Sequence, residues 1–398
     1  MEDRKSKNDT KQPAPAIKDD QTVSQRIVAI DALRGFDMFW ITGGQQVVLT
    51  FVAMIAAIFK TQEPAWLKHQ LEHVKWSGTT VWNSFTAWDL IMPLFLFVVG
   101  AAMPFSFAKR KEQGQSTRQL YFKIVRRTLI LFVLGMACQG HLLDFDLTTL
   151  HLFSNTLQAI AIGYLIAAIL MLNVGVIAQV IFAAVMLVGY WLLLRFVPLA
   201  DHGAGSFEPK ANVAYAVEQF VTGRFIDGTN PPYTWVLSGM TFSATVLLGV
   251  FAGHVLRSRL PAWGRVGVLM LLGAACLAGG WVWAELLGFP IIKHIWTSSM
   301  VLWAGGWSYL LLALFYLVID VIGFRRWAFP FIVIGLNAIV TYVFWEGFVP
   351  FPSIAEHLVG GLARHLGPAG PFTVAFTAFM LGWLVLYDLY RRKIYLRL

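Results

Sequence analysis

The chain has 398 residues, of which 57% are hydrophobic and 13% are charged. This is too little charge to cover a soluble globule of that length, so the composition excludes a soluble class and indicates an all-α, polytopic membrane protein. The net charge of +9 does not indicate a nucleic-acid partner, because the basic residues lie in short connectors between apolar runs. Cys138 and Cys276 lie inside apolar runs, so we expect neither a disulfide nor a metal site.

Residues 1–25 are polar, lysine-rich and contain prolines without an apolar signal-peptide core, so they predict a disordered cytoplasmic tail. Residues 26–398 are predicted to form a single transmembrane domain. A crossing needs roughly 20 apolar residues, and on this rule the sequence predicts about ten spans. The first is longer than one crossing requires and could begin as an interfacial helix. The predicted spans are 28–58, 86–108, 120–140, 152–172, 175–197, 234–256, 266–288, 298–320, 328–349 and 371–390.

The basic connectors support this arrangement of spans. Segments 109–127, 257–265, 325–326 and 391–397 are basic and alternate with connectors that hold few basic residues. By the positive-inside rule, both termini are predicted to be cytoplasmic. All histidines except His254 then fall on or near the opposite face. Solvated loop positions explain most of them, and the alternative is that one or two line a site on that face.

Three charged residues, Asp31, Arg34 and Asp37, lie in the first predicted span, where ionisable groups are costly. Asp31 and Arg34 are three residues apart, so an intrahelical ion pair is the structural explanation. The alternative is that Arg34, close to the basic connector 109–127, holds phosphate or pyrophosphate. With Asp37 one turn further in, the three residues together favour a helix that lines a cavity.

A histidine and a carboxylate meet at the start of the second predicted span. His73 lies in a tryptophan-rich loop, where its imidazole could accept a proton from an amine or hydroxyl, or carry an acyl group. The structural alternative is an interfacial loop histidine among belt residues such as Trp76 and Trp82. Asp89 begins an apolar run, so it must be paired, hydrogen-bonded or protonated, and a helix N-terminal cap is its structural explanation.

Four further polar side chains lie in predicted spans. Asn155 and Gln158 share a face of the fourth span, and Asn337 and Glu346 lie in the ninth. Amides in apolar helices commonly hold helices together, which is the structural explanation for these positions. The functional alternative is that they line a site.

A cluster that contains Lys293 and His294 precedes the eighth predicted span and is a weaker candidate for a site. The chain contains no Walker motif, no GxGxxG at a strand-to-helix turn and no HExxH motif. ATP-driven pumping and zinc proteolysis are therefore unsupported.

From about residue 26 onward, ordered blocks of the chain resemble the transmembrane heparan-alpha-glucosaminide N-acetyltransferase family and its bacterial relatives. Each block is short and apolar, and it is their joint order that is specific. The blocks are IDALRGFDMFWITGG, EHVKWSG, AWDLIMPLFLFVVG, RRTLILFVLGM, LQAIAIGYL, GVFAGHVLRS, IIKHIWTSSMVLWAGGWSYLLLALFYLVID and PFIVIGLNAIVTYVFWE.

The resemblance implies an enzyme that moves the acetyl group of cytoplasmic acetyl-CoA to the amine of a glucosamine across the membrane. The family's catalytic histidine lies in a His-x-x-Trp-small-Gly motif, which His73, Trp76, Ser77 and Gly78 match. Here an extra piece around 80–87 separates the motif from the aspartate. An alternative alignment places Trp82 at the motif's tryptophan and leaves Thr79 at the place of the histidine.

For this reaction we assign roles to the candidate residues by the physical need that each could meet. His73 would be the base or a transient acyl carrier, and Asp89 would orient it. The remaining assignments are Arg34, Arg126 and Arg127 for the CoA phosphates, Asn155 and Gln158 for the thioester carbonyl or the sugar, and Trp76, His294, Asn337 and Glu346 for the acceptor. We expect no metal, and a homodimer is compatible with the glycine-rich helix faces.

The polar tail in place of a large domain resembles the bacterial branch, so a bacterial plasma membrane is the expected location. The rival hypothesis is an amino-sugar transporter that uses the same intramembrane carboxylates as a proton relay. It predicts uptake of a labelled sugar that survives the change His73→Ala. Against it, the sequence shows no two-fold pattern of matched broken helices such as many transporters have.

Overall fold

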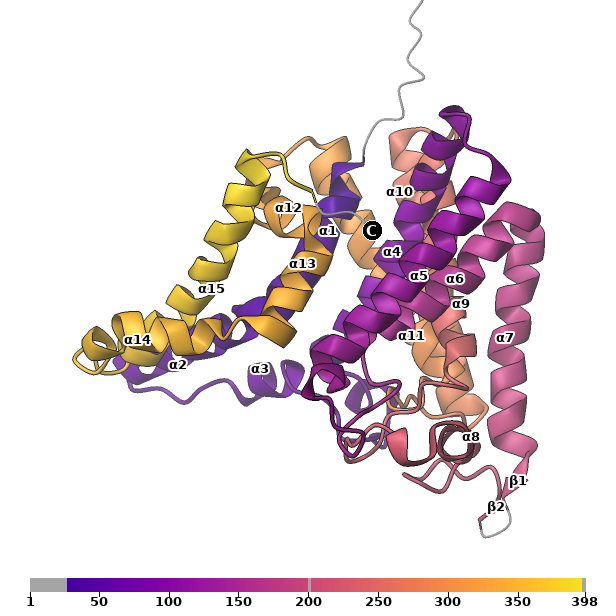
Figure 1. Cartoon of the computed structure of the whole chain (residues 1–398), viewed down its shortest axis with the longest axis horizontal. Coiled ribbons are helices and arrows are strands. Elements are labelled where there is room, and N and C mark those ends of the chain that lie inside the picture. The colour runs from indigo at the N-terminus through magenta and orange to yellow at the C-terminus, as the bar shows by residue number, and fades with distance from the viewer. Residues whose placement is uncertain (1–26, 200–201, 396–398) are drawn as a thin grey trace, which may run out of the picture.

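The computed structural model describes residues 27–199 and 202–395, so the predicted tail 1–25 lies outside the described part (Figure 1). Helices dominate it, and its strands are the short antiparallel pair β1 (Pro198–Leu199) and β2 (Gly203–Ala204). The prediction of an all-α protein is confirmed. The α-helices are α1 Val28–Phe39, α2 Gln45–Phe59, α3 Ala65–Gln70, α4 Ala87–Glu112, α5 Thr117–Gln139, α6 Thr156–Asn173, α7 Val176–Phe196, α8 Val213–Thr222, α9 Gly239–Arg257, α10 Ala262–Trp281, α11 Ser298–Tyr316, α12 Phe329–Leu336, α13 Ala338–Val343, α14 Phe351–Ala363 and α15 Ala369–Arg391.

Eight helical segments among the described residues are long and apolar enough to cross a membrane. A ninth candidate is the pair Arg326–Leu336 and Ala338–Phe348, which bends by 72° at Asn337. The remaining predicted span, 120–140, corresponds to α5, which has 23 residues. Its first half carries several arginines and a lysine, so its composition alone does not qualify it as a span. The chain is a multi-pass membrane protein.

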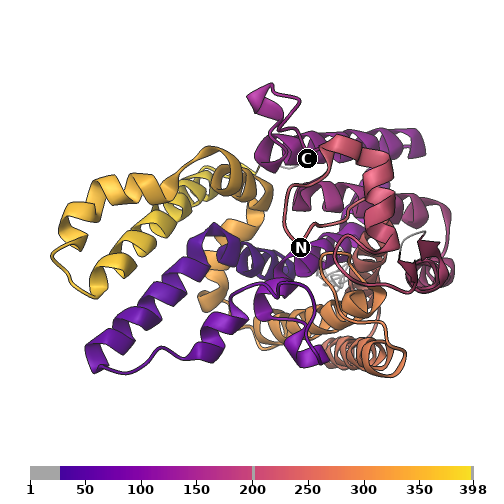
Figure 2. The same ribbon diagram turned by 90° about the horizontal axis from the view of Figure 1, so that it is seen from below.

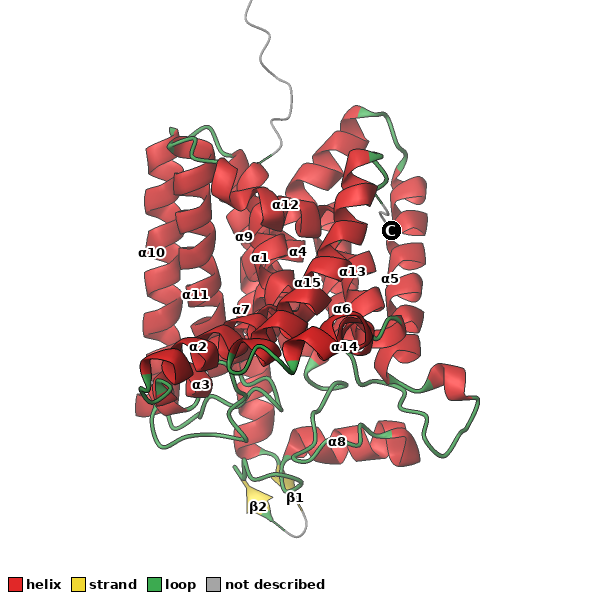
Figure 3. Cartoon of the chain, turned by 90° about the vertical axis from the view of Figure 1, so that its left-hand side faces the viewer, coloured by secondary structure: helices red, strands yellow, loops and turns green. Residues whose placement is uncertain are grey.

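The first predicted span is two helices rather than one. A π-helical segment, η1 (Trp40–Gly44), separates α1 from α2, and Gly43 adopts φ +92° there, a conformation that favours glycine. Beyond this break α2 lies, like α14, across the direction of the long helices (Figure 1, Figure 3). The expectation that an interfacial segment would begin this span is therefore wrong, because the part that lies across the bundle is its end.

Local sequence fixes where the helices that carry the candidate site begin. Thr86 and Asp89 form a capping box at the start of α4, in which each side chain satisfies a backbone N–H of the other. Asn155 caps α6, with its Oδ1 accepting from the Leu157 N–H at 2.7 Å. The polar residues predicted near these positions therefore define the helix ends.

The centre of the bundle is the contact between α4 and α9. In each of these helices 78% of the most apolar window is buried inside the protein. The backbones approach closely at Gly100 and Gly249, where an added Cβ would lie 2.0 Å from the Val246 carbonyl oxygen and 1.9 Å from that of Phe97. Small residues at these crossings let the helices pack without side chains between them, as in other membrane bundles.

The two ends of the bundle differ in character. The end from which α1 starts also holds the basic last turn of α4 and the connectors 113–116 and 258–261, and we call it the basic end (Figure 1). The opposite end holds α3, α8, β1, β2 and the connector from α10 to α11, and we call it the loop end (Figure 3). This arrangement matches the predicted alternation of basic and non-basic connectors.

Candidate active site

At the loop end, three charged or titratable side chains meet within hydrogen-bonding distance. The His73 Nδ1 lies 2.7 Å from the Asp89 Oδ1. The Lys293 Nζ lies 3.3 Å from that same oxygen and 3.3 Å from the His73 Nδ1. Asp89 and Lys293 are buried, whereas the His73 side chain keeps 45% of its surface exposed. A substrate at the loop end can therefore reach the imidazole but not the two residues behind it.

The Asp89 carboxylate is held by the start of α4 and in turn holds the loop that carries His73. Its Oδ2 accepts from the backbone N–H groups of Thr86 and Val74, each at 3.3 Å. The Thr86 hydroxyl also donates to the Glu72 carbonyl at 2.8 Å, on the residue next to His73. A carboxylate in the first turn of a helix is favoured by the helix dipole. The backbone on both sides of His73 is thus held by the start of α4, through Glu72 and Val74.

These contacts determine which nitrogen of His73 can act as a base. With Asp89 as acceptor, Nδ1 carries the proton and Nε2 keeps its free lone pair. Burial and the nearby Lys293 ammonium lower the pKa of His73 from 6.5, against the raising effect of Asp89. The imidazole is therefore neutral at pH 7 and able to accept a proton through Nε2.

Aromatic rings line the approach to these charges. The His294 ring stacks on Tyr233 at 4.2 Å between centroids and lies 5.3 Å from Trp76. Burial, together with the Lys293 ammonium, lowers the pKa of His294 to about 4, so its ring is neutral. Trp76 is fixed by its indole N–H, which donates to the Phe207 carbonyl at 2.9 Å. The predicted site residues Trp76 and His294 therefore lie beside His73, Asp89 and Lys293, which we call the His73 group.

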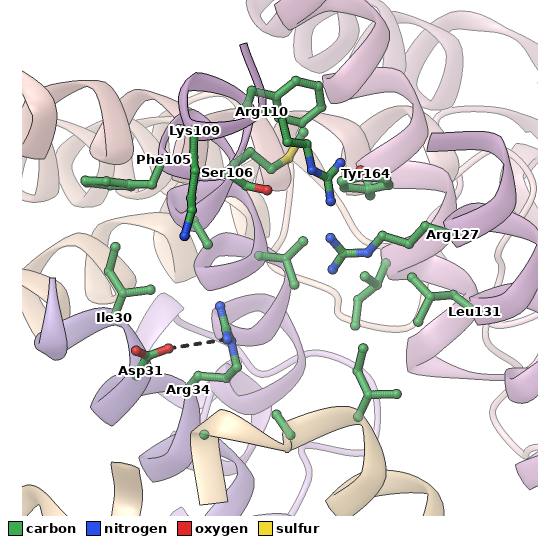
Figure 4. Close-up of a pocket in the computed structure, with 18 of the residues that line it drawn as sticks. Ile30, Asp31, Arg34, Phe105, Ser106, Lys109, Arg110, Arg127, Leu131 and Tyr164 are labelled. Carbon is green, nitrogen blue, oxygen red and sulfur yellow. Dashed lines mark ion pairs between the residues drawn. The ribbon is translucent and has the colours of Figure 1, made fainter. Parts of the chain in front are cut away.

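A cavity of about 670 Å³ opens at the basic end between α1, α4, α5, α6 and the break that joins α12 to α13. Figure 4 shows side chains of α1, α4, α5 and α6 converging in it. The Arg34 guanidinium is 3.7 Å from Asp31 on the same helix, and Arg127 lies over the Tyr164 ring at 4.4 Å. The basic residues that line the cavity are Arg34, Lys109, Arg110, Lys123 and Arg127.

The cavity runs from these cations deep into the bundle. On α4 it is lined from Lys109 to Phe95, a separation of fourteen residues or roughly 21 Å along the helix axis. Phe95 is six residues from Asp89, or roughly 9 Å along the same helix. On α6 the cavity reaches Leu157, in the first turn at the loop end. A cationic mouth and an apolar inner end therefore lead toward the His73 group.

Several predicted site residues lie outside both the His73 group and the cavity at the basic end. Arg126 is exposed and does not line the cavity, where Lys109, Arg110 and Lys123 contribute instead. Asp37 is buried deeper in α1, and neither of its carboxylate oxygens has a hydrogen-bond partner among the described residues. Sequence spacing places Asp37 near Arg34, but the packing of α1 keeps it off the cavity wall.

The amides of α6 are engaged with the protein itself. Asn155 donates to Gln139 at 3.0 Å and to the Tyr342 hydroxyl at 3.2 Å. Gln158 accepts from the Ser154 N–H at 2.9 Å and donates to the Leu152 carbonyl at 2.7 Å. Neither side chain lines the cavity. Both side chains therefore shape the turn into α6, and their assignment to the thioester or the sugar stays a prediction.

The two candidates of the ninth span also lie apart from His73. Asn337 occupies the break between α12 and α13, and its side chain donates to the Ile394 carbonyl at 3.1 Å. Glu346, in the π-helical segment η8 (Phe344–Phe348), accepts from Gln139 at 3.1 Å. Glu346 therefore belongs to the network of Gln139 and Asn155, so the structure does not gather these residues with His294.

Lys293 is the residue that sequence reasoning undervalued. Its position beside His294, before an apolar span, marked it only as one member of a weak cluster. The partner Asp89 is 204 residues away, so no local spacing could reveal the pair. The insertion around 80–87 forms a short 3₁₀ turn at Val81–Asn83. The Val81 N–H donates to the Glu285 carboxylate at 2.8 Å, which holds this turn in place. His73 thereby reaches Asp89 across the insertion, as the alignment that places His73 in the motif requires.

The chain is similar in sequence to curated proteins from two mammals. The chain is 25% identical over 395 residues to the heparan-alpha-glucosaminide N-acetyltransferase of Homo sapiens, covering 79% of this chain and 54% of that protein. It is 23% identical over 385 residues to the protein of that name from Mus musculus, covering 79% and 55%. The chain thus spans about half the length of these curated relatives. No protein-family model matches it. The relationship predicted from the sequence blocks is confirmed, and this chain is related at the family level to the heparan-alpha-glucosaminide N-acetyltransferases.

Proposed function

We propose that this protein is a membrane N-acetyltransferase that takes the acetyl group of acetyl-CoA at the basic end and delivers it to an amine at the loop end. The observation that carries the proposal is the cavity, which begins among cations and ends roughly 9 Å along α4 from Asp89. The names of the curated relatives supply the reaction class. In a bacterial cell the loop end would face outward from the plasma membrane.

The cationic mouth suits the phosphates of coenzyme A. Arg34 and Arg127 present planar guanidinium groups, which bind phosphate oxygens through paired, charge-assisted hydrogen bonds. Lys109, Arg110 and Lys123 add positive charge around them. The inner wall is apolar, with Phe95 and Leu157 among its residues, and would hold the neutral pantetheine arm. The thioester would then approach His73 from inside the bundle.

In the proposed reaction the amine nitrogen of the acceptor attacks the thioester carbonyl. The Nε2 of His73 takes the proton that the nitrogen loses, while the C–S bond breaks and an amide forms. The proton on His73 then passes to the departing thiolate, giving CoA-SH and the neutral imidazole. Asp89 accepts the Nδ1–H throughout and stabilises the imidazolium formed between these steps.

A variant of this route uses His73 itself as the nucleophile, so that an acetyl-histidine intermediate forms before the amine reacts. The partly exposed imidazole of His73 fits either role. Only the variant predicts ping-pong kinetics and release of CoA when acetyl-CoA is supplied without an acceptor. Measuring free CoA in that half-reaction distinguishes the two.

The test is acetyl transfer from labelled acetyl-CoA to glucosamine by the purified protein in nanodiscs. His73→Ala is expected to abolish transfer while the protein still binds CoA. The matched control is His69→Ala, which removes an exposed imidazole from the neighbouring helix α3 and should leave transfer intact. Failure of the wild type to acetylate any amino sugar would refute the proposal.

A transporter is the second candidate function, and one feature of the fold favours it. The bend of 72° between Arg326–Leu336 and Ala338–Phe348 marks a broken span or a re-entrant loop, and transporters use broken helices at substrate sites. Uptake of labelled glucosamine into proteoliposomes without acetylation, unchanged by His73→Ala, would establish this function in place of acetyl transfer.

A further inference from the structure

A second large cavity, of about 840 Å³, lies between α2, α14 and the first half of α15, and we call it the wing groove. Figure 2 shows α2 on one side and α14 with α15 on the other, projecting together from the bundle. The proposed acetyl transfer assigns no role to this space. Its size is within the range of sites that bind small organic ligands.

The lining of the wing groove changes from its base to its tip. Near the bundle it is lined by the indoles of Trp40 and Trp345 and by the amide of Gln45. Aromatic faces and amides are the groups that bind the apolar and hydroxyl sides of a sugar ring. Further out, small or apolar residues such as Gly360 and Ala375 line it together with polar ones such as Thr50 and Arg364. The groove is therefore amphipathic along its length.

The charges in the groove balance. Glu356 on α14 and Arg364, directly after that helix, both line it, one of each sign. An acidic lipid would meet the Glu356 carboxylate, and a simple cation would meet the Arg364 guanidinium. A polar group with hydroxyls can hydrogen-bond to both side chains, which favours a sugar over an anionic headgroup.

The helices that form the groove carry lipid-facing side chains on their other surfaces. On α2, Phe51 is 45% exposed and Phe59 is 70% exposed, and on α14 Leu358 is 64% exposed. Helices that lie across a bundle with large exposed apolar residues lie in the membrane interface. We therefore expect the open side of the groove to face the bilayer.

The base of the groove is tied to the His73 loop. The Gln45 side-chain amide lines the groove and donates to the Leu71 carbonyl at 2.5 Å. Leu71 is two residues before His73, so their Cα atoms lie within about 7 Å of each other. A ligand whose sugar rests against Gln45 would place its amine close to the imidazole.

We propose that the wing groove binds the hydrocarbon chain of the acceptor, so that the acceptor is a membrane-anchored amino sugar rather than a free one. The sugar would occupy the base near Trp40 and Gln45, and the chain would run past Gly360 and Ala375 into the bilayer. The inference rests on the proposed acetyl transfer, whose amine it identifies by chemical class.

The experiment compares two acceptors in nanodiscs, methyl 2-amino-2-deoxyglucoside and its octyl analogue. The ratio of their kcat/KM values is expected to favour the octyl acceptor by at least about tenfold, equivalent to roughly two buried methylene groups. Gly360→Leu places a side chain in the groove, where the added Cβ would first meet the movable end of Glu356. It should bring the ratio close to one.

The control is Gly361→Leu, the same change one residue along, where a Cβ meets nothing within 4 Å, and it should keep the preference. Ala375→Trp blocks the groove from α15 and should act as Gly360→Leu does, if that variant fails to fold. Equal kcat/KM for both acceptors in the wild type would overturn the inference while leaving acetyl transfer established. So would a preference that both groove variants retain, since it would then reflect partition into the bilayer alone. No transfer to either acceptor would overturn the proposed function and this inference together.

Discussion

The change Asp89→Asn tests whether the buried charges behind His73 act as a unit. The amide keeps the size of the side chain and can still accept from the Val74 N–H, but it leaves the Lys293 ammonium without a counter-charge. Asp89 is 2% exposed and Lys293 9% exposed, so water cannot replace the lost partner. Breaking a buried ion pair in this way costs about 3–5 kcal/mol in free energy of unfolding.

The double variant Asp89→Asn with Lys293→Met removes both charges at once. Replacing a buried pair by neutral groups of similar size is commonly close to neutral for stability, so most of the loss should be recovered. Activity should not recover. The introduced amide would donate to His73 Nδ1, leaving the hydrogen on Nε2 and removing the base. We expect transfer to fall by about 10²–10⁴-fold in both variants.

The assay is reversible unfolding in mixed micelles for the wild type, Asp89→Asn, Lys293→Met and the double variant, with acetyl transfer measured on each. A double variant whose free energy of unfolding lies near the wild type, and above both single variants, is the expected result. A double variant as unstable as the sum of the single changes would refute the reasoning, since the charges would then contribute independently.

Three further predictions follow from the described contacts. Arg34→Gln should raise the KM for acetyl-CoA by about tenfold or more, as expected for a lost charge-assisted hydrogen bond, whereas the exposed Arg126→Gln should leave the KM unchanged in steady-state assays. The Lys293 ammonium lowers the pKa of His73, so Lys293→Met should raise that pKa; because the base works only when unprotonated, the acid limb of the kcat/KM profile should move to higher pH. Glu218 on α8 is buried, and burial raises its pKa above 4.5, so its contribution to stability is lost as pH rises. Glu218→Gln should therefore flatten the fall in unfolding temperature above about pH 4.5. An unchanged slope would contradict this prediction.

The helical class, the order of most helices and the alternation of basic connectors could all be read from the sequence. They depend on local composition, since roughly 20 apolar residues make a span wherever they occur. The same reasoning failed at 28–58, where hydropathy stays high through both α1 and α2 although the direction of the chain changes at Gly43. An apolar run gives the length of a helical segment, but not its angle to the bilayer.

For the candidate site, too, some contacts could be predicted from the sequence and others could not. His73 and Asp89 could be paired from the sequence because they lie 16 residues apart, on either side of one loop. Asn155 and Gln158 gave an equally strong signal, yet their hydrogen bonds fix the start of α6. A polar residue in an apolar run must find a partner, and whether that partner is a ligand or the protein depends on packing.

The sequence by itself determined that this chain crosses a membrane many times, that its basic connectors share one side, and that a histidine precedes a buried carboxylate at the other. The tertiary structure decided what surrounds them. It brought Lys293 to within 3.3 Å of both, gathered five basic residues from three helices around one cavity, and turned α2 to form the wing groove. These contacts join residues far apart along the chain, so they depend on how the helices pack and cannot be predicted from a local sequence pattern.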